Sequence, residues 1–312
     1  MNIQIILHQL LTLFLLMGAG FMLFRIGWMP PDFNRALTRL LIHVAMPLLI
    51  FDSVLKLEQR APLSTVLLVL SAALSLYLIL PLFGWLVSRA LFVPKAQRGL
   101  YIYMTTFSNV GFMGFPLISA LLSPEAVFYT ALFNLIFNLS SFSYGILLIR
   151  SSQRDSSAEK KESPRLSLLL SPGILLSLLA MIWYFAALPF PAPAADVVGY
   201  LGGLTTPLAM LLTGASIASM KFKDMVRDFR MYPFLLLKQI ALPLCLYPLF
   251  RFFIRDELVL NVSLIMLSLP VANSAVLFSI EYRADEALAA RGVFLTTLFS
   301  IATIPIVVFL CL

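Results

Sequence analysis

Charged residues are scarce in this sequence. Only 12% of the 312 residues are Asp, Glu, Lys or Arg, whereas 61% are hydrophobic. Soluble domains carry about 25% charged residues. A chain of this composition cannot hide so much apolar side chain in one water-facing core. The shortage of charge therefore excludes an ordinary soluble protein and predicts an all-α integral membrane protein.

The sequence also lacks cysteine clusters and catalytic signatures. Its two cysteines, Cys245 and Cys311, both lie in apolar stretches, so neither a disulfide framework nor a metal-thiolate site is expected. It contains no GxxxxGK[ST] phosphate-binding loop, no HExxH and no pair of mid-membrane carboxylates. The two histidines match no spacing for a nucleophile and its base. We therefore expect no enzyme, no cofactor and no metal ion.

Hydrophobic segments long enough to cross a bilayer fill most of the chain. A spanning helix needs ~20 mostly apolar residues. Ten spans are predicted, at roughly 5–24, 35–56, 63–90, 98–121, 125–149, 166–188, 198–219, 231–253, 258–281 and 287–311. Alternate loops differ in charge, because 17 of the 22 Lys and Arg fall in one set and four in the other. This bias predicts that the basic loops are cytoplasmic and that both termini lie outside. It also explains the net charge of +7 without a nucleic-acid partner.

One polar stretch, SSQRDSSAEKKESPR at 151–165, divides the ten spans into two sets of five. The predicted domains are a first five-helix repeat at 1–150, a cytoplasmic linker at 151–165 and a second repeat at 166–312. Because five is odd, the second repeat is inserted with the opposite orientation, which is typical of inverted-repeat transporters. Prolines recur at separations of 154 to 162 residues: Pro47 with Pro207, Pro81 with Pro243, and Pro116 with Pro270.

Two predicted spans contain residues that interrupt helices. The fourth has TTFSNVGFMGFPL, and the ninth has LPVANSA. Unpaired backbone groups are costly in lipid, so broken helices are tolerated only beside protein or a water-filled cavity. Broken spans at matching positions of two repeats indicate a transport site. A glycine-rich packing face is the simpler alternative. The expected substrate-binding residues are Ser108, Asn109, Gly111, Gly114, Pro116, Pro270, Asn273 and Ser274.

SNVGFMGFP and LPVANSAVLFSIEYRAD resemble the auxin efflux carrier family, in particular its compact bacterial members, and the resemblance covers nearly the whole chain. It implies ten helices in two inverted repeats, with helices four and nine crossing at their prolines. It further implies a scaffold of spans 1, 2, 6 and 7 and a transport part of spans 3–5 and 8–10. The architecture is similar to that of bile-acid symporters, which work by an elevator-type motion. The resemblance implies organic acids such as malonate, malate or auxin as substrates.

Four further polar residues fall within the spans. Asn134 and Asn138 are four residues apart and share a helix face, either as a pocket wall or as hydrogen-bonding contacts between helices. His43 could carry a coupled proton, although a neutral, buried histidine with a hydrogen-bond partner is the simpler interpretation. Lys238 is expected to extend back to the membrane surface, with anion attraction as the alternative. No basic residue is close in sequence to Asn109 or Asn273, so helix N-termini are expected to attract the anion.

The sequence thus predicts a secondary transporter for small organic anions in a bacterial cytoplasmic membrane. The alternatives are a sodium-coupled symporter of the bile-acid type and, from another class, a membrane sensor. A sensor would need an added soluble domain, and this sequence contains none. The expected partners are the organic anion and the lipid bilayer. The sequence leaves open a homodimer.

Overall fold

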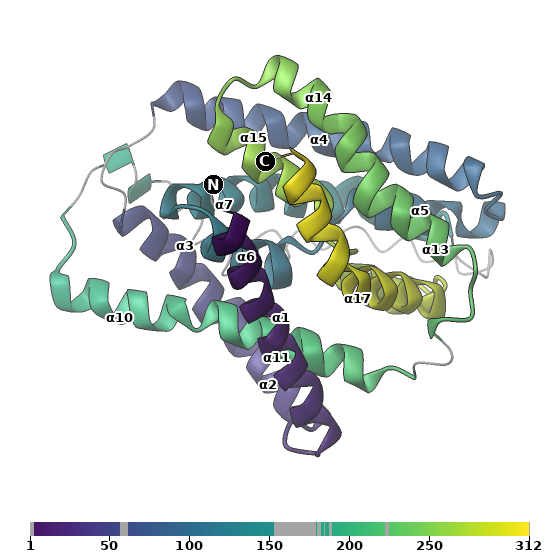
Figure 1. Cartoon of the computed structure of the whole chain (residues 1–312), viewed down its shortest axis with the longest axis horizontal. Helices are drawn as coiled ribbons and strands as arrows, with labels where there is room; N and C mark the ends of the chain where they lie inside the picture. The colour runs from purple at the N-terminus through teal and green to yellow at the C-terminus, as the bar shows by residue number, and fades with distance from the viewer. Residues whose placement is uncertain are drawn as a thin grey trace. The chain divides into compact units, whose positions relative to one another are not determined.

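In the computed structural model, every regular element of the described part of the chain is helical (Figure 1). The structure describes residues 3–56, 62–152, 179, 182–183, 185–186, 189–221 and 225–311. Most of the predicted sixth span and most of the predicted linker lie outside the described residues. The elements before that gap are α1 (Ile3–Arg25), α2 (Pro31–Leu40), η1 (Leu41–Ala45), α3 (Met46–Leu55), α4 (Leu63–Ala90), α5 (Lys95–Thr106), η2 (Val110–Gly114), α6 (Phe115–Leu121), α7 (Pro124–Ser140), η3 (Ser141–Gly145) and α8 (Ile146–Arg150).

The elements after the gap complete the helical set. They are α10 (Ala192–Gly203), α11 (Thr205–Ser219), α13 (Met231–Leu236), η5 (Leu237–Ala241), α14 (Leu242–Phe253), α15 (Glu257–Ser268), α16 (Ser274–Glu281) and α17 (Glu286–Cys311). Within the described residues, six helical stretches are long and apolar enough to span a membrane: 31–55, 63–90, 124–150, 192–219, 231–253 and 286–311. These stretches identify a multi-pass membrane protein. The count of ten spans and the inverted repeat stay predictions.

The chain forms two compact units. Unit 1 comprises residues 1–70, 110–135 and 170–220, and unit 2 comprises 71–109, 136–169 and 221–312. In unit 1, α1 packs along α11 (Figure 1). Glycine makes this contact close: a Cβ on Gly20 would overlap the backbone of Leu211, and one on Gly214 would overlap that of Met17. Small residues let helix backbones approach where lipid offers no hydrophobic driving force for association.

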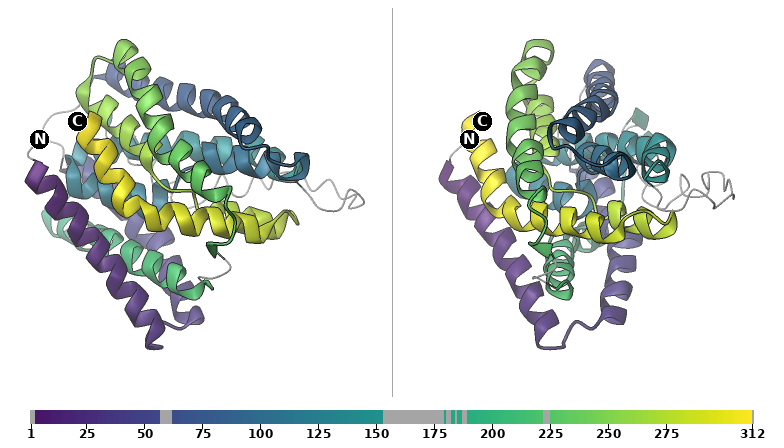
Figure 2. Two further views of the ribbon diagram at one scale, coloured as in Figure 1. Left: turned by 45° about the vertical axis from the view of Figure 1, so that its right-hand side comes forward. Right: turned by 90° about the vertical axis from the view of Figure 1, so that its right-hand side faces the viewer.

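Two further glycines shape unit 1. A Cβ on Gly202 of α10 would lie 2.9 Å from the backbone nitrogen of Leu49, so α10 and α3 also pack with their backbones close together. Gly27 has φ +83°, a left-handed conformation that suits glycine. It lies in the turn that reverses the chain between α1 and α2, drawn in purple in Figure 2.

Wide helical turns precede three of the prolines. The π-helical turns η1, η2 and η5 end two residues before Pro47, Pro116 and Pro243, respectively. Proline lacks an N–H donor and its ring clashes with the preceding turn. A widened turn accommodates both effects without ending the helix. Pro116 therefore lies in the first turn of α6, whereas the resemblance implied that helix four crosses its partner at this proline.

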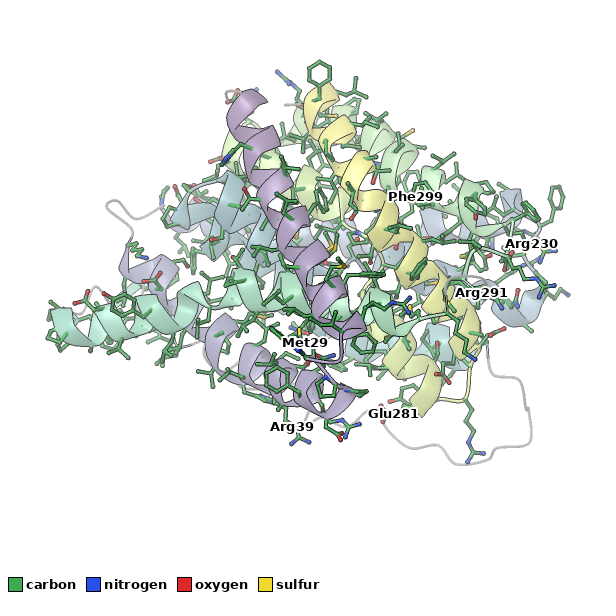
Figure 3. The ribbon with its side chains drawn as sticks, turned by 60° about the horizontal axis from the view of Figure 1, so that its bottom comes forward. Met29, Arg39, Arg230, Glu281, Arg291 and Phe299 are labelled. Carbon is green, nitrogen blue, oxygen red and sulfur yellow. The ribbon has the colours of Figure 1, made fainter. Side chains whose placement is uncertain are left out.

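In unit 2, α17 contacts α13, α14, α15 and α5. Figure 2 shows α14 in green and α17 in yellow. Helix α5 is closely approached by two glycines. A Cβ on Gly84 would lie 2.8 Å from the backbone Cα of Ile102, and one on Gly292 would overlap the side-chain Sδ of Met104. Arg291 of α17, labelled in Figure 3 with Arg230, lies 3.8 Å from Asp228. These residues tie the connection before α13 to α17.

Candidate functional site

Two non-helical segments meet inside unit 2. The first, Phe107–Asn109, follows the end of α5, and the second, Leu269–Asn273, separates α15 from α16. Ser108 and Val271 pair as an isolated antiparallel bridge. The amide of Asn109 donates to the carbonyl of Pro270 at 2.8 Å, and the amide of Ala272 donates to the carbonyl of Phe107 at 3.0 Å.

This pairing explains how the helices can be interrupted in an apolar interior. A buried, unpaired backbone group costs several kcal/mol in lipid. Here the groups freed in one segment are satisfied by the groups freed in the other. Pro270 takes part only as an acceptor, which is all that proline can provide. The pairing joins residues more than 160 positions apart, so neither segment can become helical without exposing the partner's polar groups.

Thr296 of α17 supports the second segment from another direction. Its hydroxyl accepts a hydrogen bond from the amide of Val271 at 3.0 Å and donates to the carbonyl of Gly292 at 2.6 Å. Its own backbone carbonyl accepts a hydrogen bond from the side-chain Nε2 of Gln239 at 2.9 Å. Both Thr296 and Gln239 are fully buried. The segment is therefore fixed by side chains of α17 and η5 as well as by the first segment.

Lys238 of η5 also points at the paired segments. Its ammonium donates to Oγ of Ser108 and to the carbonyl of Leu269, both at 2.9 Å. The residue is 1% exposed. The expectation that this side chain extends to the membrane surface is therefore wrong, because its nearest polar partners are the oxygens at the two interruptions. The expectation that only helix N-termini supply positive charge near Asn109 is wrong for the same reason.

Ser274, at the start of α16, is held by Tyr103 of α5. The Tyr103 hydroxyl lies 2.9 Å from Oγ of Ser274 and 2.9 Å from Oγ of Ser141. Asn273 is half-buried, and its carbonyl accepts from the amides of Val276 and Leu277 at the first turn of α16. The amides of Asn273 and Ser274 themselves donate to no group in the described part of the chain. The beginning of α16 therefore presents two amide donors and a carboxamide.

Phe107 anchors the first segment through an aromatic cluster. Its ring centroid lies 4.5 Å from that of Tyr103 and between 5.6 and 5.9 Å from those of Tyr77, Phe137 and Tyr144. Offset and edge contacts at these distances stabilise aromatic clusters beyond the area they bury. Burial of Phe107 at 0% exposure therefore fixes the point at which α5 ends.

The structure brings together some of the predicted site residues. Ser108, Asn109 and Pro270 take part in the pairing of the two segments. Asn273 and Ser274 follow directly at α16. Asn138 lies in α7, is half-buried and also belongs to unit 2.

The remaining predicted residues belong to unit 1: Gly111, Gly114, Pro116, Asn134 and His43. A Cβ on Gly111 would lie 3.3 Å from Cε of Met46, so this glycine packs against the first residue of α3. Gly114 is buried and Asn134 is half-buried. His43 is exposed on η1, so the interpretation as a buried, hydrogen-bonded histidine is wrong.

Three residues of this site were not expected there: Lys238, Tyr103 and Thr296. Lys238 carried a signal, since it is the one Lys or Arg that lies well inside a predicted span rather than near its end. Ionisable residues inside a membrane usually face the protein interior. Tyr103 and Thr296 carried no comparable signal, because tyrosine and threonine are common in apolar helices and only the folded chain shows what their hydroxyls contact.

These observations define a multi-pass membrane protein whose interior contains two interrupted helices held together by backbone pairing. The family described as membrane transport protein matches residues 5–308. The chain therefore belongs to this family, that of the auxin efflux carriers, and the resemblance seen in the sequence is confirmed.

Two relatives support the same conclusion. An uncharacterized transporter of Methanothermobacter thermautotrophicus is 27% identical over 315 residues, covering 96% of each chain. An uncharacterized transporter of Methanocaldococcus jannaschii is 24% identical over 285 residues, covering 90% of each chain. Membership of a transporter family argues against an enzyme.

Proposed function

We propose that the chain is a secondary transporter that carries small organic anions, such as malonate, malate or auxin-like carboxylates, across the cytoplasmic membrane. The observation that carries the proposal is the pairing of the two non-helical segments through Asn109–Pro270 and Phe107–Ala272. Interrupted helices at membrane depth are maintained where a polar substrate must be bound within the bilayer. In this proposal, helices four and nine of ten cross at these segments.

The start of α16 is the proposed contact for the carboxylate. The N-terminus of a helix carries about half a positive charge and presents unpaired amides. The amides of Asn273 and Ser274 meet this description, and the Asn273 side chain adds a further donor. Asn109 lies in the paired segment and supplies a second carboxamide. Such an arrangement binds an anion by directed hydrogen bonds and without an ion pair.

The proposed mechanism is alternating access of the elevator type. The bound anion moves with the part of the protein that holds the interrupted helices, while the rest stays fixed in the bilayer. The proposal places the basic loops in the cytoplasm and both termini outside, on the basis of the distribution of Lys and Arg.

A thermal-shift screen of the purified protein tests the proposal. A ligand that binds only the folded state raises the melting temperature with its concentration. We expect at least one mono- or dicarboxylate to do so, and the matching primary amide or alcohol to have no effect because it lacks the charge. Uptake of the same anion into proteoliposomes then tests transport. A screen in which uncharged analogues stabilise the protein as well as carboxylates do would reject the anion as substrate.

A further inference from the structure

The Lys238 ammonium is a buried charge with no acidic partner. Among the described residues, no carboxylate forms an ion pair with it, and its hydrogen-bond partners are the Ser108 hydroxyl and the Leu269 carbonyl. Burying an ammonium is costly unless its surroundings are built to receive it. The residues around it must therefore supply negative partial charge in another form.

Two helix C-termini supply this charge. The helix α5 ends at Thr106, one residue before the paired segment, and α15 ends at Ser268, directly before Leu269. Each helix C-terminus carries about half a negative charge. Together they match one positive charge, and Lys238 bonds to an oxygen at each of them: Oγ of Ser108 and the carbonyl of Leu269. Unwound backbone carbonyls such as that of Leu269, and the C-terminal ends of half-helices, are what transporters use to bind sodium ions.

We propose that Lys238 is a tethered cation that permanently occupies a cation-binding position between Ser108 and Leu269, so that substrate binding needs no sodium ion there. Its position explains why an ammonium is tolerated at 1% exposure without a carboxylate. It also assigns opposite roles to the helix ends: the C-terminal ends are neutralised by Lys238, and the N-terminal end at α16 remains for the anion. The inference about substrate binding rests on the proposed function, whereas the cation position itself does not.

Removing the lysine side chain should create a true metal-ion site. Lys238→Ala leaves a space bordered by the Leu269 carbonyl and the Ser108 hydroxyl, and a further buried oxygen, Oε1 of Gln239, has no hydrogen-bond partner in the described structure. Lys238→Met is the matched control, because its side chain fills the space but provides neither a charge nor an oxygen. Lys95→Ala, at an exposed position in the first turn of α5, controls for loss of a basic residue.

The experiment measures the melting temperature of the purified full-length protein and its variants in choline chloride, replaced stepwise by NaCl, LiCl or KCl at constant ionic strength. The parent and Lys95→Ala should melt at the same temperature in every salt. Lys238→Ala should melt lower in choline and gain about 3 °C or more, saturably, with a small alkali cation. Lys238→Met should melt lower in all salts, without that gain.

Three results would overturn the inference: a sodium-specific stabilisation of the parent, no cation response of Lys238→Ala, or an equal response of Lys238→Met. If Lys238→Ala gives no folded protein in choline, its recovery in NaCl is the supporting result. If Lys238→Ala gives no folded protein in either salt, the experiment is repeated with Lys238→Ser, whose hydroxyl adds an oxygen. If this variant also fails to fold in both salts, the inference is rejected. The melting experiment contains no substrate, so it stands apart from the carboxylate screen. A carboxylate that stabilises the parent only in sodium would reject the inference and leave the transport function intact.

Discussion

The Tyr103 hydroxyl lies 2.9 Å from Oγ of Ser274, and through this bond α5 holds the first residue of α16. The same hydroxyl bonds to Ser141 at the start of η3. One tyrosine therefore links three helical elements of unit 2 at the point where the second interruption ends. It also orients the residue whose backbone amide we assign to the anion.

Replacement of this hydroxyl should weaken both the fold and the site. Tyr103→Phe leaves the buried Ser141 hydroxyl and the half-buried Ser274 hydroxyl without their shared partner, which should cost about 1.5 kcal/mol of stability. We expect a lower melting temperature and weaker carboxylate binding. Tyr101→Phe is the control, because the Tyr101 hydroxyl makes no hydrogen bond to any described residue. Equal destabilisation by the two substitutions would show that the Tyr103 bonds contribute nothing beyond ring packing.

Pro270, Pro116 and Pro81 should differ in importance. Pro270 lies within the second segment, and the preceding Leu269 has ψ 150°, the extended conformation that proline favours in the residue before it. Pro270→Ala would let α15 continue, which would withdraw the Leu269 carbonyl from Lys238. We expect at least about tenfold slower uptake into proteoliposomes, the loss that corresponds to one charge-assisted hydrogen bond.

Pro116→Ala and Pro81→Ala should be milder. Pro116 follows a widened turn in a continuing helix, and Pro81 lies inside the long helix α4. Neither substitution should disrupt the pairing of Phe107–Asn109 with Leu269–Asn273. Uptake by either variant as slow as that of Pro270→Ala would contradict the assignment of the second interruption to the transport site.

Membrane orientation can be tested at two short connections. Ala96 and Ser123 are both exposed. Ala96 lies beside the predicted cytoplasmic end of the fourth span, and Ser123 lies beside its predicted external end. In a background with Cys245→Ser and Cys311→Ser, we expect Ser123→Cys to react with a membrane-impermeant thiol reagent in intact cells. Ala96→Cys should react only after the membrane is opened. The reverse pattern would show that the 17-to-4 distribution of basic residues has been assigned to the wrong sides.

The sequence could predict the segments that matter but not their partners. Glycine, proline and asparagine within an apolar stretch drew attention to 105–117 and to the region of Pro270, because these residues act locally on the backbone. The contact of Lys238 with Ser108 joins residues 130 positions apart, and no local pattern contains it. The first interruption falls at Phe107–Asn109 rather than at Pro116, because η2 absorbs the proline. The ring cluster around Phe107, which ends α5, is likewise a tertiary effect.

The last prediction separates the stability of α16 from its function. Asn273→Asp would place a carboxylate beside the helix N-terminus, where negative charge stabilises a helix by about 0.3–1 kcal/mol. The same carboxylate would occupy or repel the position proposed for the substrate. We therefore expect a melting temperature that is unchanged or higher, together with loss of the carboxylate-induced shift. Asn273→Ala should instead lower affinity by about tenfold, since it removes one donor without adding charge.

Asn261→Asp provides the control for charge. Asn261 is half-buried near the beginning of α15, so the same change is made in unit 2 at the opposite end of the helix from the interruption. It should leave carboxylate binding unchanged, whatever its effect on stability. An Asn273→Asp protein that binds the carboxylate as the parent does, or loses binding only to the extent that Asn261→Asp does, would remove the start of α16 from the substrate site. A fall in melting temperature with binding retained would mean that the Asn273 carboxamide serves the fold alone.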